Sequence, residues 1–411
     1  MSPVRRIVVV TILLLAGATP SWSQTTGREA EGTRPALGRD YGCVVCHADM
    51  RSAFVQGVHS ERGIVCDDCH GGDPTALETG PAHSGDFIGA PDKRETVELC
   101  ASCHASPDLM RQYGLAAGQR AEFRTSRHGQ LLEAGDFNAP SCADCHDSHR
   151  IFPPGDARSR VYPTNIPGTC GRCHQNAEMM AEYGASTDEV VRYLESTHAA
   201  QLFGMQNFAA PTCVGCHGAH SALPPRISEI ANVCGHCHAL VQAAFESGPH
   251  GAAAARGVPL GCTACHSNHG TERTSSDAIE ATCLRCHAEG SEPALLGADI
   301  ESSILHAGAD MERADSAIHQ LVRDGRDVTD TRFRYQSALT DYEQLAQVQH
   351  SLSAERLEDL TLRVSSISRD IRGAAEASAE RRWEHRLFLV PVWFLALAAI
   401  FLAWLKLRNL S

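Results

Sequence analysis

Residues 128–174 contain the stretch that decides the fold: His128-Gly129, Cys142-Ala143-Asp144-Cys145-His146, His149 and Cys170-Gly171-Arg172-Cys173-His174. Two segments of this stretch share the pattern CxxCH, in which two cysteines are separated by two residues and followed at once by a histidine. This pattern is the attachment signature of c-type haem, because the two thiols bond one porphyrin and the histidine ligates its iron. His128 and His149 lie outside the two motifs, so each is available as the sixth ligand of an iron.

The CxxCH pattern occurs nine times and uses all 18 cysteines of the chain. We predict thioether bonds at Cys43, Cys46, Cys66, Cys69, Cys100, Cys103, Cys142, Cys145, Cys170, Cys173, Cys213, Cys216, Cys234, Cys237, Cys262, Cys265, Cys283 and Cys286. The predicted proximal iron ligands are His47, His70, His104, His146, His174, His217, His238, His266 and His287. Structural zinc sites and redox disulfides also use CxxC pairs, but neither requires a histidine after every pair.

The motifs are arranged as repeats. The motif at Cys43–His47 stands alone, and the other eight form four two-haem repeats. An aromatic residue lies five positions before a histidine ahead of each repeat, in the pairs Phe54 and His59, Phe123 and His128, Tyr193 and His198, and Phe245 and His250. In the last three repeats a further histidine follows the first motif by three residues: His149, His220 and His269. The first repeat has Asp73 there, and its nearest substitute is His83.

Thirteen of the 22 histidines remain after the proximal ligands are assigned. His236 lies inside its own motif, and His319, His350 and His385 fall in the predicted helical tail, so we set these four aside. The candidate distal ligands are then His59, His83, His128, His149, His198, His220, His250, His269 and His306. The alternative for each is a surface histidine, above all for His83 and His306, which have no counterpart in the repeats. Methionine is the other possible axial ligand, but the methionines keep no fixed offset from the motifs.

With its paired CxxCH motifs, the stretch 43–290 resembles the multihaem c-type cytochromes, a broad group that includes periplasmic and membrane-anchored electron carriers. The resemblance implies nine covalently attached haem c groups, histidine on both faces of many irons, and redox partner proteins. Only 6% of the residues are aromatic, which is thin for a conventional core. We therefore expect a mainly α and irregular fold that is organised by its haems.

The two ends of the chain predict export and anchoring. Residues 1–23 have the features of a signal peptide, with Arg5 and Arg6 before an apolar run, and 24–42 form a flexible lead. Residues 387–405 are uncharged and long enough, at ~1.5 Å per residue, to cross a hydrocarbon core of roughly 30 Å. The basic tail 406–411 is typical of a cytoplasmic end. We predict a bacterial periplasmic protein held in the inner membrane by this C-terminal transmembrane helix.

Between the motifs and this anchor, residues 291–386 lack cysteine and place apolar residues at helical spacing. Breaks near Gly325 and Ser353 favour three helices in an up-down-up bundle, with Ser353 as an N-cap. This segment is expected to be a stalk. A dimerising coiled coil, which would make the protein a homo-oligomer, is the alternative.

Net charge and motif content limit the functions. The formal charge is −13 and there is no basic cluster, which argues against nucleic-acid binding. The leading hypothesis is a non-catalytic electron carrier between a quinol-linked donor in the membrane and a periplasmic or outer-membrane acceptor. A reductase of a small nitrogen or sulfur oxyanion is the alternative, and it requires one iron with an open sixth position. Direct quinol oxidation is disfavoured by the C-terminal anchor, and a haem-based sensor by the short tail.

Overall fold

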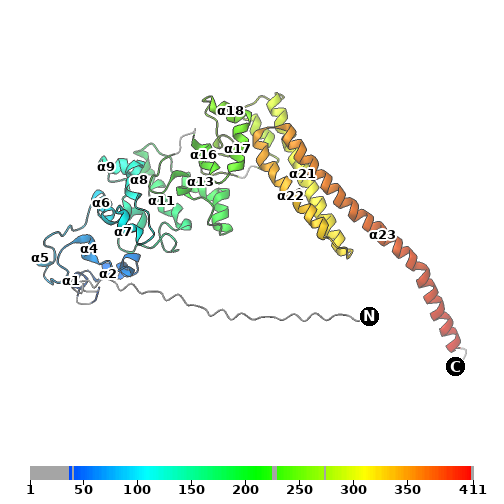
Figure 1. The fold of residues 1–411 in the computed structure, drawn as a ribbon, viewed down its shortest axis with the longest axis horizontal. Coiled ribbons are helices and arrows are strands. Elements are labelled where there is room, and N and C mark those ends of the chain that lie inside the picture. The colour runs from blue at the N-terminus through cyan, green and yellow to red at the C-terminus, as the bar shows by residue number, and fades with distance from the viewer. Residues whose placement is uncertain (1–36, 39–40, 225–228, 273–274, 409–411) are drawn as a thin grey trace, which may run out of the picture.

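The computed structural model describes residues 37–38, 41–224, 229–272 and 275–408. Every regular element within these ranges is a helix, which confirms the mainly helical fold class. The predicted signal peptide and most of the flexible lead lie outside the described residues. The described chain has two parts, a region of short helices and loops and a region of three long helices, and the two follow each other along one axis (Figure 1).

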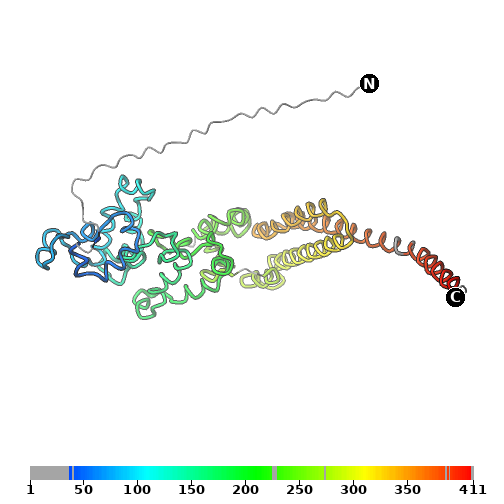
Figure 2. Tube along the Cα trace, turned by 90° about the horizontal axis from the view of Figure 1, so that it is seen from below, coloured from blue at the N-terminus to red at the C-terminus, as the bar shows by residue number. Residues whose placement is uncertain are grey.

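The first part, residues 41–290, runs from the blue end to the green end of the tube in Figure 2. Its first half contains α1 Gly42–Cys46, α2 Ala48–Phe54, α3 Val58–Glu61, α4 Cys66–His70, α5 Thr79–Ala82, α6 Lys93–His104, α7 Pro107–Arg111, α8 Gln119–Thr125, α9 Arg127–Glu133, α10 Cys142–His146 and the 3-10 helix η1 Pro163–Asn165. Its second half contains α11 Ile166–His174, α12 Ala177–Ala181, α13 Glu189–Glu195, α14 Thr197–Ala199, the π-helix η2 Ala200–Gly204, α15 Cys213–His217, α16 Ile230–Gly235, α17 Ala239–Ser247, α18 Pro249–Ala255, α19 Thr263–His266 and α20 Ile279–Leu284. Apolar clusters in this part are small, such as Val97, Leu132 and Ala139.

The second part consists of α21 Glu292–Arg323, α22 Thr329–Val348, the 3-10 helix η4 Gln349–Ser351 and α23 Ala354–Arg408. Gly325, with φ of +69°, ends the first helix in the left-handed conformation that glycine adopts without steric cost. The chain runs out along α21, returns along α22 and runs out again along α23 (Figure 1). The three helices and the positions of their breaks agree with the expected up-down-up bundle.

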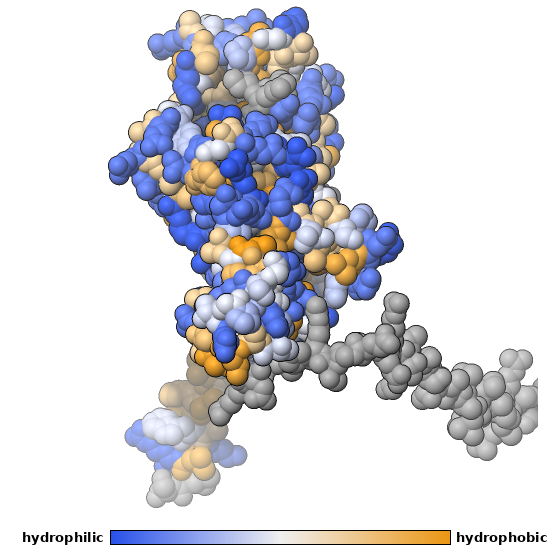
Figure 3. Space-filling view, turned by 90° about the vertical axis from the view of Figure 1, so that its left-hand side faces the viewer, coloured by the Kyte–Doolittle hydropathy of each residue, from blue (hydrophilic) through white to orange (hydrophobic). Residues whose placement is uncertain are grey.

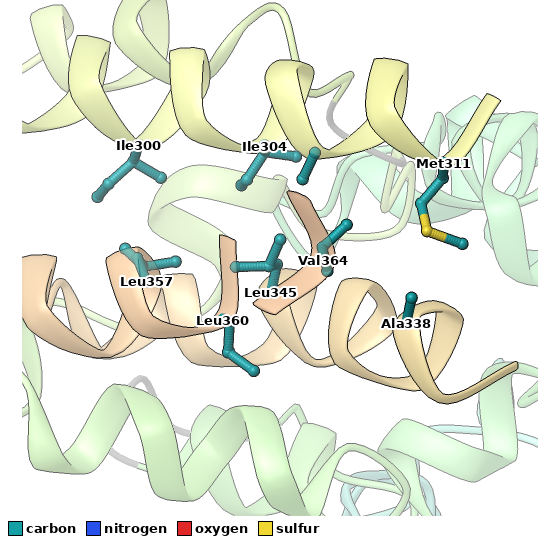
Figure 4. Packing of buried hydrophobic residues seen from close by; sticks show 9 residues of the cluster. Ile300, Ile304, Met311, Ala338, Leu345, Leu357, Leu360 and Val364 are labelled. Atoms are coloured by element: carbon teal, nitrogen blue, oxygen red, sulfur yellow. The ribbon is translucent and has the colours of Figure 1, made fainter. Parts of the chain in front are cut away.

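The bundle is held together by apolar side chains at helical spacing. Ile300, Ile304 and Met311 of α21 meet Leu357, Leu360 and Val364 of α23, with Ala338 and Leu345 of α22 closing the cluster (Figure 4). A second cluster further along includes Ile318, Leu321, Val328 and Ile371. These three helices therefore form a conventional hydrophobic core.

α23 continues far beyond the bundle, as the red end in Figure 2 shows. It is the one described helix that is long and apolar enough to cross a membrane, and the apolar stretch is not buried against other described residues. This agrees with the predicted membrane anchor at 387–405. Pro391 lies within the stretch.

Candidate haem-binding array

The CxxCH motifs take two local forms. We call the first CxxCH motif of each repeat its leading motif and the second its trailing motif. Each leading motif forms a single helical turn, in α4, α10, α15 and α19. The next residue has positive φ in every case: Gly71, Asp147, Gly218 and Ser267. The trailing motifs, which begin at Cys100, Cys170, Cys234 and Cys283, instead lie in or at the end of a helix that starts before the motif. The repeat seen in the sequence is thus also a repeat of backbone conformation.

Each of the nine motif histidines faces a second histidine. The pairs are His47 with His83, His59 with His104, His70 with His149, His128 with His174, His146 with His220, His198 with His238, His217 with His269, His250 with His287, and His266 with His350. Their ring centroids are 5.9 to 6.3 Å apart. Two metal–imidazole bonds of ~2.0 Å and the two ring radii would separate the centroids by roughly 6.4 Å. The spacing therefore suits one metal ion between each pair of rings.

The pairs follow a rule that joins neighbouring repeats. The histidine that lies five positions after an aromatic residue faces the trailing motif of its own repeat, as His128 faces His174. The histidine three residues after a leading motif faces the leading motif of the preceding repeat, as His220 faces His146. Ligand donors of the second kind therefore cross from one repeat to the next. Their ring planes meet at 12° to 16° in the three internal pairs.

The two ends of the array depart from this rule. His83, at the C-terminal end of α5, faces His47 of the lone motif. His350, in η4 between the second and third bundle helices, faces His266.

One expected distal residue is placed elsewhere. His306 is exposed on α21 in a shallow hollow with Glu301 and Arg313, and within the described ranges no motif histidine has a ring contact with it. The list of facing histidines is therefore corrected: His350 replaces His306. Sequence reasoning missed His350 because it set aside the whole helical tail. A usable signal was that His350 alone among those tail histidines lies at a predicted helix break.

Hydrogen bonds orient several of these imidazole rings. The Nδ1 atom of His70 lies 2.9 Å from the carbonyl oxygen of Gly89, and the Nδ1 atom of His217 lies 3.1 Å from the carbonyl oxygen of Leu223. In His350 the corresponding distance is 3.2 Å to the carbonyl oxygen of Gln347. Because a carbonyl oxygen only accepts, Nδ1 carries the proton and Nε2 keeps its lone pair for a metal.

Burial keeps many of the paired histidines neutral. Loss of water contact is the leading cause that lowers the pKa of His59, His104, His128, His146, His149, His198, His250, His269 and His350. A lowered pKa favours the neutral imidazole, which is the form that binds metal. These nine rings are therefore held in the protonation state that ligation needs.

A continuous cavity of about 3800 Å³ runs through the first part and is lined by residues of all nine motifs. A pocket for one small ligand has a volume on the order of 300–1,000 Å³, so this cavity has room for several large groups. On the face of the molecule drawn in Figure 3, apolar patches interrupt a mostly hydrophilic surface. The cavity thus lies between the motifs, where a domain of conventional construction would have its hydrophobic core.

The donor set fits haem better than a bare metal ion. No group of three or more His, Cys, Asp or Glu side chains that could hold a metal occurs among the described residues. Each histidine pair supplies two opposed ligands and leaves the plane between the rings without a protein donor. A porphyrin supplies four nitrogen ligands in that plane, and the two adjacent thiols are free to bond it.

The thiols of successive motifs adjoin in sequence order. The pKa of the Cys100 thiol is raised by its neighbour Cys142, that of Cys170 by Cys213, and that of Cys234 by Cys262. Burial is the leading cause that raises the pKa of five further thiols, and a thiol of an adjoining motif raises it further: Cys66 beside Cys43, Cys69 beside Cys100, Cys145 beside Cys173, Cys216 beside Cys237, and Cys265 beside Cys286. Every motif therefore has a thiol close enough to a thiol of the next motif to affect its pKa, from the first motif to the ninth.

A scan against known protein families and searches of curated proteins and solved structures find no match for this chain. Function must therefore be inferred from the residues and their arrangement. The features that bear on it are the paired histidines, the adjoining thiols and the long cavity between them.

Proposed function

We propose that this chain is a nonahaem c-type cytochrome that carries electrons between a quinol-linked membrane donor and a periplasmic or outer-membrane acceptor. The observation that carries the proposal is the pairing of all nine motif histidines with second histidines at metal-ligating distance. When bound, haem iron changes between its ferric and ferrous states and so holds or releases one electron.

The protein's part in this function is to hold and order the sites. The cysteines would bond each porphyrin and the two histidines of each pair would ligate its iron, and bis-histidine ligation favours low-spin iron at low potential. Adjoining thiols from the first motif to the ninth support a single file of sites in sequence order. Electrons would then enter at one end of the array and leave at the other.

The histidine pairing argues against the reductase alternative. A haem that reduces a nitrogen or sulfur oxyanion needs an open sixth position where the substrate binds iron. Every motif histidine here faces another histidine, and no motif has lysine in place of its histidine. We therefore propose no catalytic residue.

The length of the bundle bears on which molecule donates electrons to the array. From Ala354 to the start of the apolar stretch at 387, α23 rises ~1.5 Å per residue, or roughly 50 Å in all. The array adjoins the end of the bundle where α23 begins (Figure 1). If the apolar end spans the inner membrane, the array lies far from the quinol pool. A partner protein, rather than direct quinol oxidation, would supply the electrons.

The test combines a haem count with the spin state of iron. A pyridine haemochrome assay of the purified chain should give nine haems, and electron paramagnetic resonance of the oxidised protein should show only low-spin iron. A chain without covalent haem would overturn the proposal. A high-spin iron that responds to nitrite or sulfite would favour the reductase instead.

A further inference from the structure

Neighbouring repeats are joined by a recurring backbone hydrogen bond. The amide of Val58 donates to the carbonyl oxygen of Ile151 at 2.8 Å. The same bond joins Arg127 to Ala222 and Thr197 to Thr271, each at 3.2 Å. In every case the donor directly precedes the histidine that faces a trailing motif, and the acceptor lies two residues after the histidine that crosses between repeats.

This register defines a joining segment of three residues in each of the last three repeats. The joining segments are His149–Ile151, His220–Ala222 and His269–Thr271. The histidine of each joining segment faces the leading motif of the preceding repeat. The carbonyl oxygen of the segment's third residue accepts the hydrogen bond from the amide that directly precedes His59, His128 or His198. The fourth repeat has no following repeat, so its leading motif at Cys262–His266 lacks a joining segment from the array.

Residues 350–352 of the bundle lie where a joining segment for the fourth repeat would lie. His350 faces His266 with ring centroids 6.0 Å apart, within the 5.9 to 6.1 Å of the internal crossing pairs, and with the ring planes at 27° rather than 12° to 16°. Gly248 lies two residues before His250, as Gly57 lies two residues before His59. A Cβ atom on Gly57 would lie 3.0 Å from the amide nitrogen of Ile151 and 3.1 Å from the carbonyl oxygen of His149, the third and first residues of the joining segment. A Cβ atom on Gly248 would lie 2.7 Å from the carbonyl oxygen of Ser351, the middle residue of the turn. Two backbones therefore approach closely at both the first and the fourth repeat, with the contacted residue shifted by one position.

The sequence of the fourth repeat differs from that of the other repeats at the position that lies beside the turn between α22 and α23. The residue before His250 is Pro249, which has no amide hydrogen, whereas the equivalent residues in the other three repeats each donate one. The fourth repeat therefore has no amide donor at this position, and it needs no carbonyl acceptor from a following repeat.

The bundle fixes the geometry of this turn. Leu352 has φ of +53°, a left-handed conformation that is uncommon for leucine, and its side chain packs against the core of Ile300, Leu345 and Leu357. The hydroxyl of Ser351 donates to the carbonyl oxygen of Val348 at 2.7 Å. His350 is therefore positioned by the helices on either side of it.

We propose that the α22–α23 turn acts as a surrogate fifth repeat, in which His350 is the distal ligand of the haem iron attached at Cys262, Cys265 and His266. This inference rests on the proposed function. It makes the bundle a cap for the array, in the way that terminal caps complete repeat proteins. The eighth site is then incomplete without the bundle, and the anchor is joined to the array through an iron–histidine bond.

The test uses full-length, haem-loaded protein and compares H350A with H306A. H350A should keep nine haems but convert one of the nine irons to high spin, and added imidazole should restore it to low spin. H306A should leave every iron low-spin. Nine low-spin irons in H350A, or a high-spin iron in H306A, would overturn the inference. A wild-type chain without haem would instead overturn the proposed function.

Two further variants keep the test independent of folding. H350M retains an axial ligand and should raise the reduction potential of a single haem in a spectroscopic titration, because thioether ligation raises the potential. G248A should push the turn away and give a partial high-spin signal, whereas G155A, where a Cβ meets nothing within 4 Å, should give none. Unchanged titrations and spectra in H350M and G248A would contradict ligation by His350.

Discussion

The array and the bundle reach stability in different ways. Among the described residues, 15 apolar side chains are buried over 41–290, against 17 over the far shorter stretch 292–375. The bundle has a continuous apolar core, whereas the array has small clusters around a large cavity. The array therefore buries fewer apolar side chains than a domain of its length needs, and this supports the proposal that haem completes its interior.

The largest effect should come from withholding haem. In a host without haem-attachment machinery, residues 41–290 should lose their fold, because burial of apolar surface cannot offset chain entropy there. Residues 292–375 should stay helical. Hydrogen exchange read by mass spectrometry measures both regions in one sample, and equal protection of the array with and without haem would remove the contrast.

Removing one crossing ligand should have a smaller effect, confined to one junction. H149A should give one high-spin iron with nine haems still attached, and should loosen the contact between the first and second repeats. H128A should give one high-spin iron without loosening that contact, because His128 and His174 belong to one repeat. Proteolysis near residue 151 distinguishes the two variants, and equal cleavage would contradict the pairing rule.

A cavity in the bundle should lower its stability without changing the haem count. Leu345 is fully buried at the centre of the core, so Leu345→Ala should cost about 2–5 kcal/mol in the free energy of unfolding. Leu305 is 46% exposed on α21, and Leu305→Ala is the matched control with little expected effect. Denaturant unfolding followed by far-UV circular dichroism measures both, and equal midpoints for the two variants would contradict the assignment of the core.

The smallest effect concerns pH. Asp310 is buried in the bundle, where burial tends to raise its pKa, but hydrogen bonds from Ser365 and Arg313 outweigh this and lower the pKa below its ordinary value. A lowered pKa in the folded state means that the stabilisation is present above the unfolded value of about 3.9 and is lost as pH falls through the folded value.

Asp310→Asn should therefore destabilise the bundle at neutral pH by roughly 1–3 kcal/mol. It should also flatten the loss of stability below about pH 4. Asp330→Asn, at an exposed position on α22, is the control. Parallel pH profiles for wild type and Asp310→Asn would show that the buried carboxylate has no such role.

Much of the fold was predictable because its signals are local. The apolar spacing in 291–386 and the breaks near Gly325 and Ser353 predicted three helices, and the structure has three in that segment. The uncharged stretch 387–405 likewise predicted the apolar end of α23. Helical periodicity and helix ends depend on neighbours within a few residues, so the sequence shows them directly.

The sequence by itself determined where the thiols and the motif histidines lie, because a CxxCH motif is complete within five residues. Only the tertiary structure decided which histidine faces which motif. The members of each pair are 36 to 84 residues apart, so their meeting depends on how repeats and bundle pack. His350 is the plainest case, since it lies beyond two long helices. It reaches His266 because the bundle folds its turn back onto the last repeat.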